Sequence, residues 1–182
     1  MKKIVVQIGR TGKLTPVALL DPVDVKGVTI SRASLHNEKQ AQKLGISEGT
    51  KVKVERAGDV IPQVKEVTEE SGETFEMPSE CPICGSEVIG EEEHHVCSGE
   101  VSCPAQLERK LEHFASEEAM DTEGLGEKVA GQLVESGLVE EITDLYRLEK
   151  DNLLELDRFA DRSAGNFLTR SKIREMWIWR LS

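Results

Sequence analysis

The four cysteines constrain the fold of this chain more than any other feature of its sequence. They lie within 23 positions, at Cys81, Cys84, Cys97 and Cys103. The first two form a C-x2-C pair followed by Gly85, a spacing that turns two thiolates toward one ion, and the later two can complete a tetrahedron. Four thiolates around Zn²⁺ leave no open position for a substrate, so the pattern predicts a structural zinc site. The binding energy of such a metal is folding energy.

Other uses of these cysteines fit the sequence less well. A disulfide framework needs an oxidising compartment, and the N-terminal segment has no long apolar core of the kind found in signal peptides. A redox C-x-x-C pair would leave the last two cysteines without a role. A mixed site is the main alternative, because His94 and His95 lie close to Cys97.

Charge divides the chain into two parts. Residues 1–67 carry 12 Lys and Arg against 7 Asp and Glu, a net charge of +5, whereas residues 68–182 carry 11 against 27, a net charge of −16. The cationic part is the better candidate for a polyanionic partner. The acidic part is typical of a solvated surface or of an acid-rich proteome adapted to salt. No apolar run is long enough to span a membrane.

Short apolar runs separated by turn residues predict five strands in the first 70 residues. The segment 51–56 alternates valine with charged residues, which is typical of a half-buried strand. A helix is expected late in this region, over residues 35–44 and ending at Gly45. This order predicts a small Greek-key barrel of the oligonucleotide-binding (OB) type.

Two arginines of this barrel stand next to glycines, in Gly9-Arg10-Thr11-Gly12 and in Arg56-Ala57-Gly58-Asp59. Glycine lets a backbone approach a nucleic-acid strand closely. The planar guanidinium of arginine suits a phosphate or the edge of a groove. The same pattern is also typical of exposed arginines at ordinary turns.

The remainder of the chain predicts a zinc ribbon and then helices. The segment between the cysteine pairs is typical of a β-hairpin, and a helix is expected over residues 104–115, beginning at Pro104. Gly124-Leu125-Gly126 precedes a second helix over residues 127–135. Backbone N–H groups at such a helix start suit a phosphate, although a turn that binds nothing has the same pattern. The predicted domains are an OB fold over 1–68, a four-cysteine zinc ribbon with its following helix over 69–115, and a partial helix-hairpin-helix segment over 116–182.

This order of modules, together with six longer runs, resembles the NAD-dependent DNA ligases. The resemblance extends over about residues 4–170. The matching runs are Val6–Gly12, Thr15–Ala18, Ser34–Asn37, Glu55–Val64, Cys81–Gly85 and Met120–Gly126.

The resemblance implies an enzyme family that seals nicks in duplex DNA during replication and repair. Adenylate from NAD passes to an enzyme lysine and then to the 5′-phosphate, with Mg²⁺ as the metal cofactor. That lysine belongs to a K-x-D-G motif, which this sequence lacks. The chain is therefore expected to correspond to a C-terminal portion of such an enzyme. NAD and Mg²⁺ would bind outside this chain, and the chain alone would not ligate DNA. The resemblance further implies a monomeric protein of the cytoplasm, associated with the nucleoid, which could meet an adenylation domain in trans.

The resemblance also assigns roles to residues, none of them catalytic. The four cysteines would hold the structural zinc, and the glycines Gly124 and Gly126 would contact the phosphate backbone. Five barrel residues match positions expected to touch nicked duplex DNA across its minor groove. The two arginines would hold phosphates and the apolar pair would enter the groove. These five are Arg10, Thr11, Arg56, Val60 and Ile61.

The sequence departs from the family pattern in two places. Ala160 stands where a second hairpin usually has glycine, which puts a phosphate contact there in doubt. Beyond Leu168 the match ends, and a frameshift near this residue is one hypothesis, which resequencing of the locus would test. A novel C-terminal helix is the other hypothesis.

Two functions other than that of a ligase fragment also fit the sequence. The chain could be a free-standing DNA-binding module or a non-functional remnant.

Overall fold

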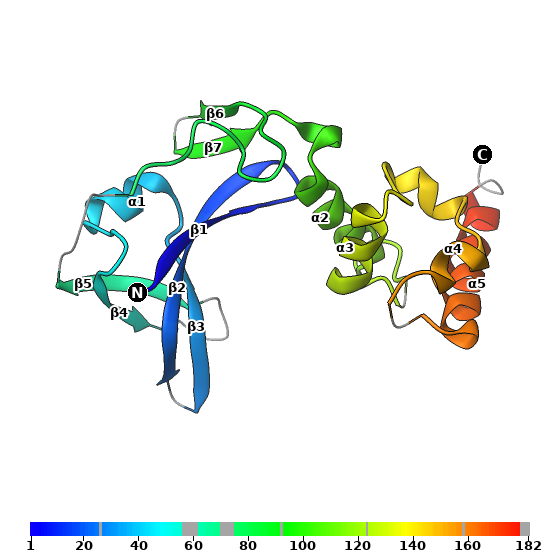
Figure 1. Ribbon diagram of the computed structural model, residues 1–182, viewed down its shortest axis with the longest axis horizontal. Coiled ribbons are helices and arrows are strands. Elements are labelled where there is room, and N and C mark those ends of the chain that lie inside the picture. The colour runs from blue at the N-terminus through cyan, green and yellow to red at the C-terminus, as the bar shows by residue number, and fades with distance from the viewer. Residues whose placement is uncertain are drawn as a thin grey trace. The chain divides into compact units, whose positions relative to one another are not determined.

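The computed structural model describes residues 1–25, 27–55, 62–69, 75–91, 93–122, 124–157 and 159–178, without the side chains of Glu91 and of 170–178. The chain forms two compact units, Met1–Gly99 and Glu100–Ser182 (Figure 1). None of the helices in the described ranges is both long enough and apolar enough to cross a membrane.

The first unit is built on one sheet, in the order β4-β5-β3-β2-β7-β6, with β1 paired to the other edge of β2. The only parallel pair within the described strands, β3 with β5, meets at Ser34 and Gln63. The elements are β1 (Lys3–Ile8), β2 (Lys13–Val25), β3 (Val28–Ser34), α1 (Glu38–Lys43), β4 (Lys51–Glu55), β5 (Gln63–Glu69), β6 (Val88–Glu91) and β7 (His94–Cys97). The first five strands, with a helix between the third and fourth, confirm the predicted OB architecture.

The helix α1 begins three residues later than the sequence pattern indicates. Leu35 is almost fully buried, and its backbone N–H donates to the carbonyl oxygen of Pro16 (3.0 Å), so the chain still follows the sheet there. Asn37 then caps the helix, because its Oδ1 accepts from the backbone N–H of Gln40 (2.8 Å). Tertiary pairing, which the local pattern does not report, sets this boundary.

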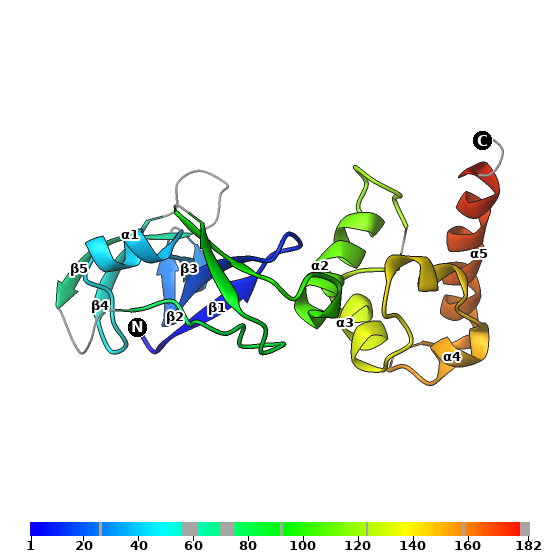
Figure 2. The same cartoon turned by 90° about the horizontal axis from the view of Figure 1, so that it is seen from above.

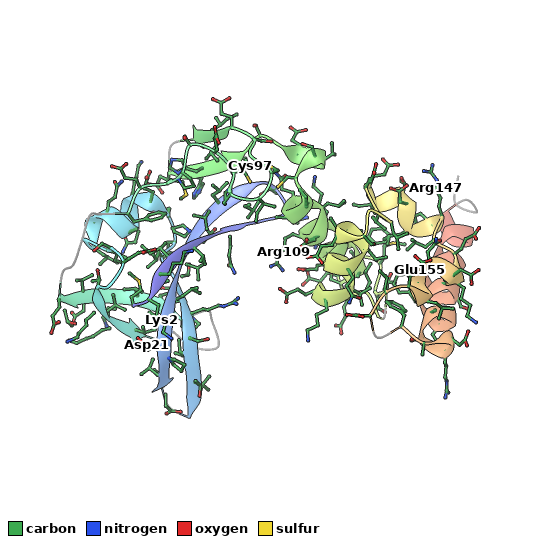
Figure 3. All side chains as sticks on the ribbon, viewed as in Figure 1. Lys2, Asp21, Cys97, Arg109, Arg147 and Glu155 are labelled. Atoms are coloured by element: carbon green, nitrogen blue, oxygen red, sulfur yellow. The ribbon has the colours of Figure 1, made fainter. Side chains whose placement is uncertain are left out.

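Alternation along β4 and β5 separates an apolar face from a charged one. Val52 and Val54 are half-buried against the barrel core. Lysines on the outer face pair across to glutamates of the neighbouring strand, as Lys51 does with Glu69 (2.9 Å). Exposed pairs of this kind contribute about 0–1 kcal/mol each. Lys2 makes a similar contact with Asp21 of β2 (3.2 Å; Figure 3).

The strand β2 is the centre of the first unit. It is 13 residues long, and its register with β3 shifts between Leu19 and Val23. Beyond the end of β1, β2 and β3 continue as a two-stranded arm (Figure 1). Its beginning pairs with β7, Lys13 opposite Val96 and Leu14 opposite His95. The β-hairpin predicted between the cysteine pairs is confirmed, and it continues the sheet of the barrel (Figure 2).

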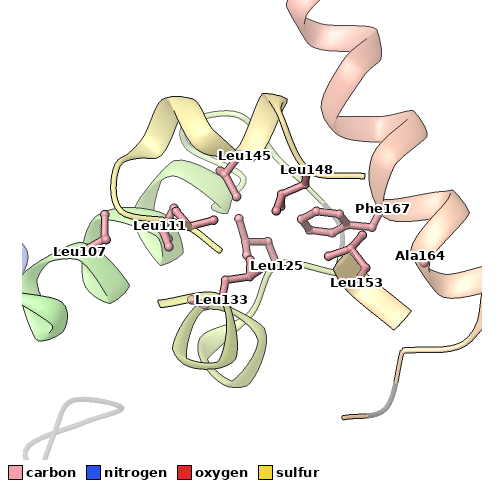
Figure 4. Packing of buried hydrophobic residues seen from close by; sticks show 11 residues of the cluster. Leu107, Leu111, Leu125, Leu133, Leu145, Leu148, Leu153, Ala164 and Phe167 are labelled. Atoms are coloured by element: carbon pink, nitrogen blue, oxygen red, sulfur yellow. The ribbon is translucent and has the colours of Figure 1, made fainter. Parts of the chain in front are cut away.

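The second unit packs its helices around a leucine-rich core (Figure 4). The elements are η1 (Glu100–Ser102), α2 (Pro104–Ala115), α3 (Glu127–Glu135), η2 (Ile142–Tyr146), α4 (Lys150–Leu154) and α5 (Asp161–Ile178). The helices expected over 104–115 and 127–135 have these bounds in the structure. Leu111, Leu133 and Leu153 have no exposed surface, and the ring of Phe167 packs among them.

One carboxylate of this unit gives a pH-dependent prediction. Burial of Glu108 on α2 raises its pKa, and the nearby carboxylates of Glu135, Glu112 and Glu127 raise it further, while Arg109 opposes them. A raised pKa in the folded state means that the stability from this group is full at low pH and is lost as the pH rises through that pKa. We expect Glu108→Gln to stabilise the protein at pH 7 by about 0.5 kcal/mol, as for removal of a like-charge helix pair.

Urea denaturation at pH 7 and pH 4 measures this effect. The gain should shrink at pH 4, where Glu108 of the parent protein takes up a proton. Glu118→Gln is the matched control, because Glu118 is exposed beyond the end of α2. An equal gain in both variants at pH 7 would assign the effect to net charge alone.

Candidate nucleic-acid interface and metal centre

Arg10 and Thr11 form the exposed tip of the turn between β1 and β2. The backbone N–H of Gly12 donates to the carbonyl oxygen of Gly9 (2.9 Å), and that of Gly9 donates to the carbonyl oxygen of Lys13 (2.9 Å). Gly12 has φ of +82°, a left-handed conformation that closes three-residue hairpin loops. The second glycine therefore serves the turn, and the turn directs two polar side chains into solvent.

The guanidinium of Arg10 has no carboxylate within ion-pair distance among the described side chains. This distinguishes it from the lysines of β4 and β5, which pair with glutamates. An exposed, unpaired guanidinium is available to a phosphate. Of the other predicted barrel contacts, Arg56, Val60 and Ile61 lie outside the described residues, just before Pro62.

The four cysteines come together at one point. Their sulfur atoms all lie within 4.8 Å of one another, and the Sγ atoms of Cys84 and Cys97 are 3.5 Å apart. Zn–S bonds of about 2.3 Å in a tetrahedron separate the sulfur atoms by about 3.8 Å. Cys97 ends β7 (Figure 3), Cys103 stands at the N-cap of α2, and Cys81 and Cys84 lie on the turn before β6.

The environment of the cysteines suits thiolate ligands. Cys81, Cys97 and Cys103 are buried and Cys84 is half-buried. Burial raises the pKa of the Cys84 thiol, but hydrogen bonds with Ser86, Cys81 and Cys97 outweigh it and lower that pKa to about 6. Metal binding requires deprotonated cysteines, so a lowered pKa favours it. The all-sulfur donor set fits a metal that prefers soft ligands in a closed tetrahedral site.

The two histidines beside the cluster make other contacts. The Nε2 atom of His94 lies 3.4 Å from the Nζ atom of Lys13, and the Nε2 atom of His95 lies 3.4 Å from an oxygen of Glu38. Glu38 also accepts from the backbone N–H of Met77. Sequence reasoning missed this role of Glu38, because its partners are about 40 and 60 residues away and no local motif joins them.

The start of α3 is open. Gly124 has φ of +94°, which an L-residue adopts only with strain. Leu125 is buried and anchors the turn. Gly126 stands at the N-cap, so the capping position has no side chain of its own, and a Cβ there would meet nothing within 4 Å. The first N–H groups of α3 therefore have room for an acceptor.

The start of α5 is different. Ser163 caps it, since its hydroxyl accepts from the backbone N–H of Ala160 (2.8 Å). Asp161 in the first turn pairs with Lys150 (2.6 Å), and the hydrogen bond from Lys150 lowers the pKa of this aspartate. The departure at Ala160 thus coincides with a helix start at which a side chain of the helix accepts from one backbone N–H, that of Ala160.

A groove of about 690 Å³ lies between α3 and α5. Gly124, Lys128 and Gln132 line it from the side of α3, and Ser163 and Phe167 from the side of α5. Among the described residues that line it, Lys128 is basic, and Glu127, Glu135 and Asp157 are acidic and oppose an anion. The groove places the glycine turn at the rim of a concave surface.

Comparison with known proteins agrees with this geometry. Residues 1–76 match the NAD-dependent DNA ligase OB-fold domain. The DNA ligase of Haloferax volcanii is 55% identical over 168 residues, which are 92% of this chain and 24% of that protein. The DNA ligase of Salinibacter ruber is 48% identical over 174 residues, 92% of this chain and 25% of that protein. The DNA ligase of Haloquadratum walsbyi is 52% identical over 166 residues, which are 91% of this chain and 22% of that protein.

The chain thus spans about a quarter of the length of the curated relatives it matches. The similarity extends well beyond the barrel, since it covers nine-tenths of the chain. The OB-fold match over residues 1–76 and the similarity over nine-tenths of the chain together support a C-terminal portion of an NAD-dependent DNA ligase.

Proposed function

We propose that this chain is the DNA-gripping part of a ligase that seals nicks in duplex DNA. The observation that carries the proposal is the exposed Arg10 at the tip of the β1–β2 turn, which pairs with no described carboxylate and lies within the matched OB-fold domain. Thr11 beside it adds a hydroxyl. Arg56, Val60 and Ile61, which lie outside the described residues, complete the contact, with the apolar pair entering the minor groove.

The second unit supplies a weaker contact. The uncapped start of α3, with Gly124 and Gly126, takes a backbone phosphate through N–H groups, so the helical segment acts as a helix-hairpin-helix module. The capped start of α5 takes none. Because residues 68–182 carry a net charge of −16, the barrel provides most of the affinity.

The four cysteines hold one structural Zn²⁺. The chain is divided into three functional segments: the OB domain over 1–68, the ribbon with its helix over 69–115, and the helix-hairpin-helix segment over 116–182. The sequence contains no K-x-D-G lysine, so adenylation by NAD, with Mg²⁺, takes place elsewhere in the ligase. The chain works as a monomer in the cytoplasm, at the nucleoid, and by itself seals no nick.

Affinity for a nicked duplex tests the proposal. Arg10→Ala removes a phosphate contact, so we expect a loss of about tenfold and a salt slope smaller by about 1. Fluorescence anisotropy at several salt concentrations measures both. Arg147→Ala is the matched control, because that exposed arginine already pairs with Asp144 (3.1 Å). Equal affinities of Arg10→Ala and the parent chain would remove the β1–β2 turn from the interface.

A further inference from the structure

A polar strip crosses the outer face of the sheet next to the β1–β2 turn. Neighbouring residues on a strand face opposite sides. Leu14 of β2 and Cys97 of β7 are each only 1% exposed, so both face the interior. Their alternation partners on the same strands, Lys13 and His94, therefore lie on the outer face, where His94 is exposed and Lys13 half-buried.

Lys13 and His94 contact each other, and no described carboxylate lies within ion-pair distance of either. The Nζ atom of Lys13 lies 3.4 Å from the Nε2 atom of His94. Within the described part of the chain, neither side chain has an acidic group in ion-pair range, whereas four other lysines of this unit each have one. Those four are Lys2, Lys51, Lys53 and Lys65. The Lys13 ammonium has three N–H groups and donates one of them to His94, so a phosphate oxygen can accept from another, and it can also accept from His94 when the ring nitrogen that faces it carries a hydrogen.

Lys13 and His94 lie on strands that are hydrogen-bonded to the turn that carries Arg10. The carbonyl oxygen of Lys13 accepts from Gly9, and the carbonyl oxygen of Gly12 accepts from the backbone N–H of Cys97 (2.9 Å), so turn and ribbon share one hydrogen-bonded frame. Along β2 the same outer face continues to Thr15. A strand of polyanion that reaches Arg10 can therefore follow the face toward β7.

We propose that Lys13 and His94 bind a DNA backbone phosphate next to the one held by Arg10, so that β7 of the cysteine ribbon takes a direct part in DNA binding. This inference rests on the proposed function of the β1–β2 turn. It gives the ribbon a second role besides holding the metal. The sequence places three glutamates, Glu91–Glu93, directly before His94, and their charge opposes a phosphate farther along the ribbon.

The test is the affinity of the full chain, loaded with zinc, for a nicked duplex. We expect about three- to tenfold weaker binding for Lys13→Gln, with a salt slope smaller by about 0.9, the value for one phosphate contact. His94→Gln should lose less, and the double variant should lose less than the product of the two, because both side chains hold one phosphate. Zinc content and melting temperature should match those of the parent chain.

Two further variants make the result decisive. Lys43→Gln removes the same charge from an exposed position at the end of α1 and should leave the slope unchanged. Lys13→Arg keeps the charge and should keep the affinity. The inference is overturned where Lys13→Gln binds as tightly as Lys43→Gln while Arg10→Ala is weakened, a result that leaves the proposed function intact. Absence of binding by the parent chain overturns both.

Discussion

Replacing Cys97 by serine should empty the metal site and unfold the β6–β7 hairpin, at a cost of more than about 4 kcal/mol. Cys97 is the member of the cysteine cluster that lies on the sheet itself, and its side chain is buried. Serine supplies no thiolate, and three sulfur ligands hold the ion far less tightly. A hairpin of two four-residue strands has little stability without the ion.

Three measurements check this result together. Metal analysis should give one zinc per parent chain and much less for Cys97→Ser. Thermal unfolding should begin at a lower temperature, and a protease should cut between β6 and β7. Val101→Ala is the matched control, because Val101 lies between two ligands in the sequence and is 72% exposed. A variant without metal that melts with the parent chain would show that the cysteines carry no folding energy.

The loss should extend to the β1–β2 turn, which is the proposed DNA contact. The backbone N–H of Cys97 donates to Gly12, the residue that closes the loop around Arg10. Without a fixed β7, the hydrogen bond between Cys97 and Gly12 is lost and the β1–β2 turn samples more conformations. Binding must then order the turn, and this entropy cost lowers the affinity for DNA. Chelation of the zinc should therefore weaken binding to a nicked duplex even when the barrel remains folded.

The sequence predicted the parts of this protein that depend on local spacing. The four cysteines, the helix that begins at Pro104 and the alternation on β4 each follow from neighbouring residues. The pairing of β2 with β7 joins residues about 80 positions apart through two residue pairs, and no local pattern reports such a register. For this reason the ribbon was predicted as a separate module, while its hairpin continues the barrel sheet.

The candidate site shows the same division. Arg10 and Gly126 were recognised from glycine-containing turns, and the structure gives both the exposure that a ligand needs. The contact of Lys13 with His94 was missed because each is an ordinary surface residue within its own strand. Only the register between the strands brings them together. The self-capping by Ser163 was also missed, although the sequence marked Ala160 as a departure.

Replacing Leu133 by alanine should destabilise the second unit by about 2–5 kcal/mol. Leu133 has no exposed surface and packs with Leu111, Leu125 and Leu145 at the centre of the helical core (Figure 4). Alanine removes three buried carbon atoms and leaves a cavity that rigid neighbours fill only in part. Leu133 also lies on α3, so the start of this helix and its glycine turn should become more mobile.

Urea denaturation of the whole chain measures the cost, and hydrogen exchange identifies the unit that bears it. Amides of α2 and α3 should lose protection while those of β1 and β2 keep theirs, because the two units have separate cores. Leu154→Ala, at a position 40% exposed, is the matched control and should cost less than about 1 kcal/mol. If Leu133→Ala exposes β1 and β2 as much as α3, the two units unfold as one, and the acidic helical part then stabilises the barrel that carries the proposed DNA contact.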